Sequence, residues 1–200
     1  MTEQSLLTWP TNAAPVYADE HVQALISRCL AGEDGAYAAL YQEYAGMIYR
    51  LTYSLLQHKE DAEEVLQDSF EYAFRRLSHY NPHKSSFKTW LYQIAISRSR
   101  NKRRRKWLPT LSLGQLVGQD VTDPHAPQPD ELAALNETQQ MVWQALGQLS
   151  VKLRETAVLR YYAGLSYGEI SGILGIPAKT AESRMRLAIK ALREILGDEG

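Results

Sequence analysis

Apolar residues recur at steps of three and four along most of this chain, with one long interruption. Between Tyr37 and Leu55 they fall on one side of a helix, and similar patterns cover residues 60–77 and the segment after about residue 131. The strict alternation that marks a strand occurs nowhere convincingly. The sequence therefore predicts an all-α fold built as two small helical bundles.

The interruption divides the chain into two parts. Residues 107–130 contain four prolines and two glycines, together with acidic residues but no lysine or arginine. This composition is typical of a flexible linker. We expect a flexible N-terminal tail over residues 1–18, a first bundle over residues 19–106, an acidic linker over residues 107–130 and a second bundle over residues 131–200.

The composition indicates an ordinary globular protein with strong local charge. Apolar residues make up 44% of the chain, and the net charge of −1 conceals a run in which seven of the nine residues 98–106 are basic. The N-terminus lacks a signal-peptide pattern, and no apolar stretch approaches the length of a membrane span. A single cysteine, Cys29, rules out an internal disulfide and suits a reducing compartment. We expect a soluble cytoplasmic protein without membrane insertion.

The C-terminal third has the pattern of a helix-turn-helix. Ser166 can cap a short helix, Gly175 can end it in the left-handed conformation, and Pro177 suits the first turn of the next helix. A second helix with polar residues near its N-terminus can enter the major groove and read it, and the alternative is an ordinary pair of packed helices. The residues that we expect to contact DNA lie on its polar face: Lys179, Thr180, Glu182, Ser183, Arg184 and Arg186.

Glu182 has two open interpretations. An acidic side chain can accept a hydrogen bond from cytosine and so read a base. It can equally be a solvated charge on the helix surface.

These motifs resemble those of the sigma-70 family of RNA polymerase sigma factors. Residues 164–192 are similar to the family's region 4 pattern "GLSYxEIAxxLGxxxxTVxSRxxRAxxAL". Residues 61–70 and 87–95 resemble "DAEDxxQExF" and "FxTWLxxIA", two motifs in region 2 of the extracytoplasmic-function (ECF) sigma factors. The resemblance covers about residues 20–106 and 131–196. It implies a bacterial transcription initiation factor that binds core RNA polymerase, directs it to promoters and helps to open promoter DNA.

An acidic stripe marks the helix expected over residues 60–77. Five carboxylates and one amide share one face there, so they must be solvated or met by a basic partner. The resemblance implies that this face binds the clamp of the polymerase's largest subunit. The contact residues that it implies, matched by position, are Asp61, Glu64, Gln67, Asp68 and Phe70.

The basic run and the aromatic motif before it fit contacts to an opened minus-ten element. Aromatic faces can stack an unpaired base, and basic side chains can hold the phosphate backbone. We expect such contacts from Lys88, Trp90, Arg98, Arg100, Lys102, Arg103 and Arg104. The alternative for the aromatic motif is a packed helix start. Residues 80–85 form the candidate pocket for a flipped base.

The chain departs from the family at several DNA-contact positions. Ser97 and Asn101 stand where relatives often carry Asn and Asp, which leaves the base preference at the minus-ten element open. Glu182, Leu187 and Ile189 stand where Lys or Arg is common. This difference predicts weak binding of the minus-thirty-five element by the second helix alone.

The linker must be extended if both bundles bind one promoter. Contacts two DNA turns apart need a separation on the order of 70 Å. A flexible linker of this length has an average span of roughly 25–30 Å. We therefore expect core polymerase to hold the linker extended.

Two rival functions follow from the same residues. An enzyme would need a catalytic or metal-binding cluster, but His79 and His83 flank Asn81 and Pro82, which disturb the helix that would align them. We expect no enzyme activity, metal or cofactor. A helix-turn-helix regulator would bind duplex DNA without replacing a sigma factor. The acidic stripe followed by the aromatic motif favours the sigma factor, and the resemblance also implies an anti-sigma partner.

Overall fold

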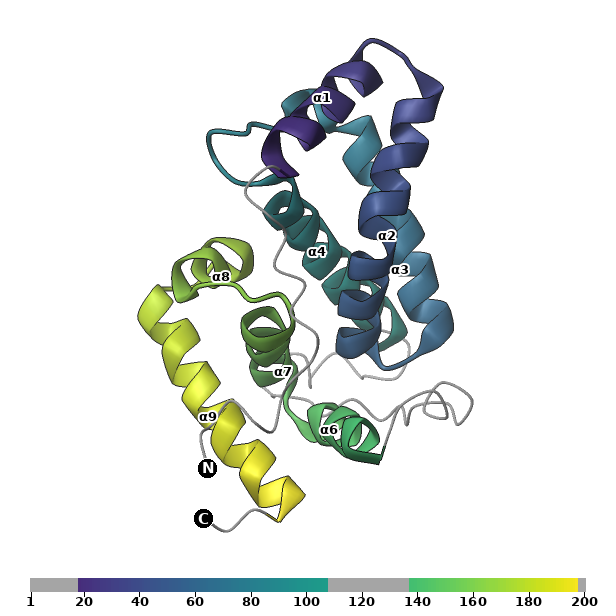
Figure 1. The fold of residues 1–200 in the computed structure, drawn as a ribbon. Coiled ribbons are helices and arrows are strands. Elements are labelled where there is room, and N and C mark those ends of the chain that lie inside the picture. The colour runs from purple at the N-terminus through teal and green to yellow at the C-terminus, as the bar shows by residue number, and fades with distance from the viewer. Residues whose placement is uncertain (1–17, 108–136, 198–200) are drawn as a thin grey trace.

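The computed structural model describes residues 18–107 and 137–197 as a set of helices. The first bundle contains α1 (Ala18–Leu30), α2 (Asp34–Leu56), α3 (Lys59–Arg75), the short 3-10 helix η1 (Leu77–His79) and α4 (Phe87–Trp107). The second contains α6 (Glu137–Gln148), α7 (Val151–Ala157), the π-helical turn η2 (Val158–Tyr162), α8 (Tyr167–Leu174) and α9 (Ala178–Leu196). The all-α prediction is confirmed within these residues (Figure 1). The predicted linker, except for Trp107 at the end of α4, and all but the last residue of the predicted tail lie outside them.

The apolar side of α2 forms the centre of the first bundle. Leu40, Ile48 and Leu55 are fully buried, as the period of three and four predicts. Tyr41 differs, because 41% of its surface is exposed while its ring lies 4.8 Å from the ring of Phe70. Helices α3 and α4 pack on α2 and on each other, and this packing orients the polar faces of α3 and α4.

Local signals set the helix ends. Ser86 is the cap of α4, since its Oγ accepts a hydrogen bond from the Thr89 amide at 3.1 Å. Ser166 and Glu169 form a reciprocal capping box at the start of α8. Gly175 ends α8 with φ +68°, the left-handed conformation that glycine adopts without strain. Pro177 lies just before α9 rather than inside its first turn, and its carbonyl accepts from the amides of Thr180 and Ala181.

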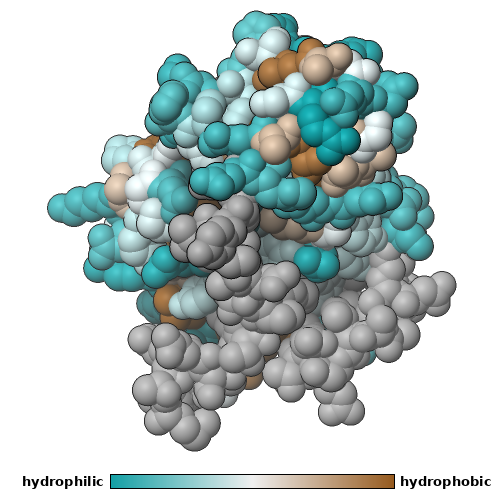
Figure 2. Space-filling model, turned by 45° about the horizontal axis from the view of Figure 1, so that its top comes forward, coloured by the Kyte–Doolittle hydropathy of each residue, from teal (hydrophilic) through white to brown (hydrophobic). Residues whose placement is uncertain are grey.

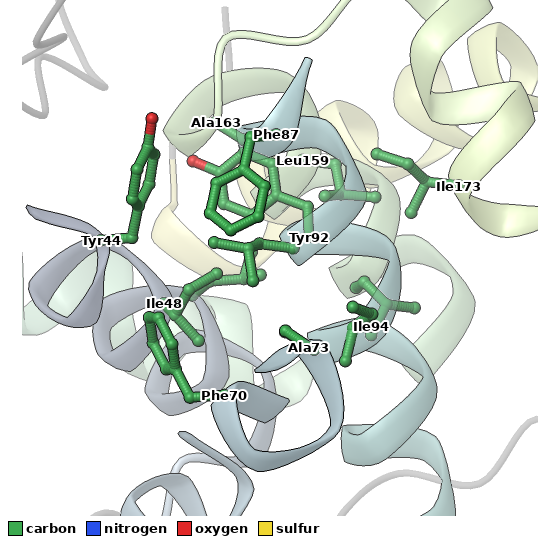
Figure 3. Close-up of a cluster of buried hydrophobic side chains, with 14 of the residues drawn as sticks. Tyr44, Ile48, Phe70, Ala73, Phe87, Tyr92, Ile94, Leu159, Ala163 and Ile173 are labelled. Atoms are coloured by element: carbon green, nitrogen blue, oxygen red, sulfur yellow. The ribbon is translucent and has the colours of Figure 1, made fainter. Parts of the chain in front are cut away.

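The two bundles share a hydrophobic core. Helix α8 lies against α4, and α7 and η2 lie against α2 (Figure 1). Apolar side chains form one continuous buried cluster from Ile48 and Tyr92 in the first bundle to Leu159 and Ile173 in the second (Figure 3). A smaller cluster of α6, α7 and α9 residues, including Leu149 and Met185, lies within the second bundle. No sequence pattern predicted the contact between the bundles.

The visible face of the molecule is mostly hydrophilic, with apolar side chains in small separate patches (Figure 2). Large apolar residues that are exposed are spread over different helices: Leu30, Tyr41, Tyr72, Met141, Leu187 and Leu196. None of the described helices is both long enough and apolar enough to cross a membrane.

Candidate nucleic-acid interface

Helix α9 presents an accessible polar face. Ala181, Met185 and Ala188 are buried on its inner side, as the sequence predicts. The helix packs on α6, α7 and α8, at the side of the molecule away from α2 and α3 (Figure 1). The outer side carries every residue predicted to read DNA: Lys179, Glu182 and Arg186 are exposed, and Thr180, Ser183 and Arg184 are partly exposed. The predicted contact residues are therefore accessible on one face of a helix, as contact with a major groove would require.

Glu182 is solvent-exposed in this arrangement. It takes part in none of the ion pairs found within residues 18–107 and 137–197. Both interpretations, a base contact and a solvated charge, are compatible with this position.

Helix α4 differs, because most of its basic side chains already have partners within the protein. The Arg98 guanidinium lies 4.4 Å from the centre of the Tyr72 ring. Further along the helix, the side chains separate toward two neighbours. Arg100 and Arg103 point to the second bundle, whereas Lys102 and Lys106 point to α3.

The contact with the second bundle centres on Glu155 of α7. Its carboxylate accepts from Arg100 Nη2 at 2.7 Å, from Arg100 Nε at 3.1 Å and from Arg103 Nη2 at 2.6 Å. The Glu155 and Arg103 side chains are only 2% and 8% exposed, and that of Arg100 is 40% exposed. Hydrogen bonding to Glu155 raises the pKa of Arg100 above its ordinary value. We refer to these three residues as the Glu155 cluster.

The contact with α3 pairs the basic run with residues of the acidic stripe. Lys106 pairs with Asp61, and Lys102 pairs with Glu64 and, at 3.4 Å, with Asp61. Burial raises the pKa of Asp61, but the hydrogen bond and charge of Lys106, with His58 and Lys102, outweigh it and leave the pKa lowered. Burial likewise lowers the pKa of Lys102, and its carboxylate partners reverse this to a net rise.

The remaining predicted minus-ten residues lie at the two ends of α4. Lys88 Nζ lies 5.7 Å above the Tyr92 ring, and Trp90 is half-buried with its ring 5.4 Å from that of Tyr80. At the other end, Arg104 is exposed. The aromatic motif therefore contributes both to the core and to the surface, because Phe87 and Leu91 are buried.

The loop before α4 is held in shape by its own polar groups. The Tyr80 hydroxyl donates to the Ser85 carbonyl at 3.1 Å, and the Asn81 side-chain oxygen accepts from the His83 amide at 2.9 Å. The Tyr80 ring also packs edge-on against Phe87. This loop lies beside the aromatic motif, as its predicted role requires.

The acidic face of α3 is only partly available to a partner. Glu64 and Gln67 are exposed and Asp68 is partly exposed. Asp61 is 7% exposed because it faces α4. Phe70 is 2% exposed, with its ring between those of Tyr41 and Phe74, so its position does not match the expected direct contact.

Buried polar residues between the bundles were missed by the sequence reasoning. Arg154 is fully buried and donates to the carbonyls of Leu55 at 3.1 Å, Gly147 at 2.5 Å and Leu149 at 3.2 Å. Gln57, on α2, donates to the Trp143 carbonyl at 2.9 Å.

A second polar link lies nearer the middle of α2. Arg50 Nε donates to the Tyr162 hydroxyl at 2.8 Å, and burial raises the pKa of this tyrosine. These residues join segments that are far apart in sequence, and they carry no motif that could have marked them.

Comparisons with known proteins agree with the two parts of the structure. Residues 40–108 match the family model "Sigma-70 region 2", and residues 139–192 match "Sigma-70, region 4". The chain is 31% identical to the ECF RNA polymerase sigma factor SigW of Bacillus subtilis, over 88% of this chain and 97% of that protein. It is 29% identical to the RNA polymerase sigma-H factor of Pseudomonas aeruginosa, over 88% and 94%.

Solved structures share the fold. The sigma factor RpoE bound to the anti-sigma factor NepR, from Bartonella quintana, is similar with a TM-score of 0.65 at 22% identity, over 82% of this chain and 98% of that one. CnrH in complex with the cytosolic domain of CnrY gives a TM-score of 0.64 at 23% identity, over 89% and 98%. With both family regions present and 31% identity across most of its length to a curated relative, the chain belongs to the ECF group of the sigma-70 family, whose members are non-catalytic transcription initiation factors.

Proposed function

We propose that the chain binds core RNA polymerase through the exposed side of α3 and directs the enzyme to promoters through α4 and α9. In this proposal residues 19–106 act at the minus-ten element and residues 131–200 at the minus-thirty-five element. The chain would supply no catalytic group of its own, because initiation by this route requires binding and strand separation only.

One observation carries the proposal. The same chain holds a partly exposed acidic face on α3, a basic helix beside it and, on α9, a helix of the helix-turn-helix with its polar residues outward. A duplex-binding regulator needs only the last of these. Opposite charges on α3 and α4 separate the proposed contact with polymerase from the proposed contact with phosphate.

Within the polymerase contact, the exposed residues Glu64, Gln67 and Asp68 would touch the clamp. The buried Asp61 would act by fixing Lys102 and Lys106, and the buried Phe70 would hold α3 on α2. On α4, Arg104 is the predicted DNA contact with an exposed side chain, and Trp90 is partly exposed.

The partners follow from the same assignment. Core polymerase and promoter DNA place the site of action in the bacterial cytoplasm. An anti-sigma protein would regulate the chain by covering surfaces that polymerase needs; the similar sigma factor RpoE has been solved bound to the anti-sigma factor NepR, which supports a partner of this kind.

The test is charge reversal on α3. We expect the double variant Glu64→Lys, Asp68→Lys to lower affinity for core polymerase at least about a hundredfold, since each new like charge opposes a basic partner. A matched double variant, Glu33→Lys and Glu43→Lys, reverses two charges on or beside α2 and should bind normally. Binding is measured by titration of labelled protein with core enzyme, and promoter-dependent transcription is measured in parallel. Full-strength association of the α3 variant would refute the proposed contact.

A further inference from the structure

The Glu155 cluster has the chemistry of an occupied phosphate site. Arg100 and Arg103 offer several N–H donors to one carboxylate, which is the arrangement by which arginines bind phosphate. The anion in the structure comes from the second bundle, so part of the positive charge of α4 is compensated within the protein. We infer that Glu155 occupies the place of a DNA phosphate and holds the free chain in a closed form that withholds Arg100 and Arg103 from nucleic acid.

Burial supports this inference. The Arg103 side chain is 8% exposed and donates to Glu155 and, at 3.4 Å, to the Leu55 carbonyl. A phosphate on a DNA strand cannot reach a guanidinium that α7 covers. Arg104 and Arg105, which point away from α7, remain exposed on the same helix. Helix α7 therefore covers only one side of α4.

The closed form is built from several interactions around the Glu155 cluster. Arg154 caps the Leu55 carbonyl at the end of α2, Gln57 bonds the Trp143 carbonyl and Arg50 bonds the Tyr162 hydroxyl. The apolar core continues across the same boundary (Figure 3). A contact of this kind holds one defined arrangement rather than a loose association.

Geometry requires this arrangement to open. Two promoter contacts two DNA turns apart need a separation on the order of 70 Å, whereas α4 and α8 pack directly on each other here. The inference rests on the proposed function for this requirement. When the bundles part, Glu155 leaves and Arg100 and Arg103 become available. The apparent affinity of the free chain for DNA is thus reduced by the fraction of molecules that are closed.

The direct test neutralises Glu155 in the full-length chain. The probe is a short fluorescein-labelled DNA single strand of mixed sequence, titrated by fluorescence anisotropy without polymerase over a series of salt concentrations. We expect Glu155→Gln to raise the affinity by about tenfold, the value of a lost charge-assisted interaction. Because each phosphate held on a single strand adds about −0.7 to the slope of log K against log salt, two freed arginines should steepen it by up to about 1.4.

Two controls isolate the cause. Glu33→Gln makes the same chemical change on an exposed side chain at the start of α2, and it should leave both affinity and slope unchanged. Adding Arg100→Gln and Arg103→Gln to Glu155→Gln should abolish the gain. A gain that survives these substitutions would overturn the inference.

A charge-neutral variant keeps the test decisive if Glu155→Gln does not fold. A methyl group at Gly147 would meet the side-chain amide of Gln57 and would displace it from the Trp143 carbonyl, which removes one hydrogen bond between the bundles, while it favours the helix. We expect Gly147→Ala to raise DNA affinity in the same direction and to increase the radius of gyration in solution scattering. Gly35→Ala, with open space around it, is the matched control. Unchanged affinity in Gly147→Ala would overturn the inference.

The outcome separates two failures. If the wild-type chain does not support promoter-dependent transcription by core enzyme, the proposed function is wrong, and the anisotropy series still tests the closed form. If transcription is normal but neither variant binds DNA more tightly, the closed form alone is refuted.

Discussion

Helices α4 and α9 both carry basic residues that we predict to contact DNA, but the two sets differ in how far they are already paired within the protein. On α9, Lys179 and Arg186 are exposed and make none of the ion pairs found in the described residues. On α4, Arg100 and Arg103 are held by α7, and Lys102 and Lys106 by α3. A basic run in the sequence thus identifies the side chains that could bind phosphate. The packing around them determines which of these side chains are accessible.

The largest expected effect comes from replacing Arg154, the buried arginine that connects α7 to the end of α2. Arg154→Met keeps an unbranched apolar stem but removes the guanidinium, which leaves the carbonyls of Leu55, Gly147 and Leu149 without their charged donor. We expect the free energy of unfolding to fall by about 2–4 kcal/mol, measured by urea denaturation, because buried acceptors lose their partners.

An exposed arginine provides the comparison. Arg75 is 75% exposed and, among the residues that the structure describes, pairs with the exposed Glu71, so Arg75→Met should change stability by less than about 0.5 kcal/mol. Equal losses in the two variants would show that the buried network adds nothing to stability.

The sequence predicts the local features well and the contact between the bundles not at all. Ser86, Ser166 and Gly175 could be assigned from their neighbours, because a cap depends on a few adjacent residues. The partners of Glu155 are 52 and 55 residues away, beyond the predicted linker. The sign of a charge does not specify which opposite charge it meets, so no period or motif could have identified this pair.

Phe70 shows a different limit. The family motif assigned it to the polymerase contact, yet its side chain is buried against Tyr41 and Phe74. Helical spacing contained the necessary signal, since Phe70 lies three residues before the buried Ala73 and eight after the buried Ala62. Motif position and helix period disagreed at this residue, and the hydrophobic effect placed the ring inside.

A smaller effect would sharpen the description of α9. Arg186→Gln removes one exposed guanidinium whose only side-chain contact in the described part is with Ser183 Oγ at 3.4 Å. If Arg186 contacts a base or a phosphate, affinity of the holoenzyme for minus-thirty-five duplex should fall about tenfold, while stability stays constant.

The control lies on the same helix. Lys190→Gln removes an equal charge from an exposed side chain that pairs with Glu194 at 3.8 Å, one turn further from the N-terminus of α9. Its duplex affinity should remain near the wild-type value in the same electrophoretic shift assay. Equal weakening in both variants would indicate general attraction to DNA rather than a specific contact at Arg186.

The smallest effect concerns the other side of α4, where Asp61 meets Lys102 and Lys106. The pKa of Asp61 is lowered from 3.8 in the folded chain, so the folded state binds this proton less readily than the unfolded state does. The resulting stabilisation is present above the ordinary carboxyl pKa and is lost as the pH falls through the folded value. Below about pH 4, we expect Asp61→Asn to reduce the slope of the unfolding free energy against pH. The reduction should correspond to less than one proton taken up on unfolding. Asp34→Asn, at an exposed position of α2, should leave that slope unaltered. A slope in Asp61→Asn equal to that of the wild type would mean that the α3 pairing is too well solvated to hold Lys102 and Lys106, and that only the Glu155 cluster distinguishes α4 from α9.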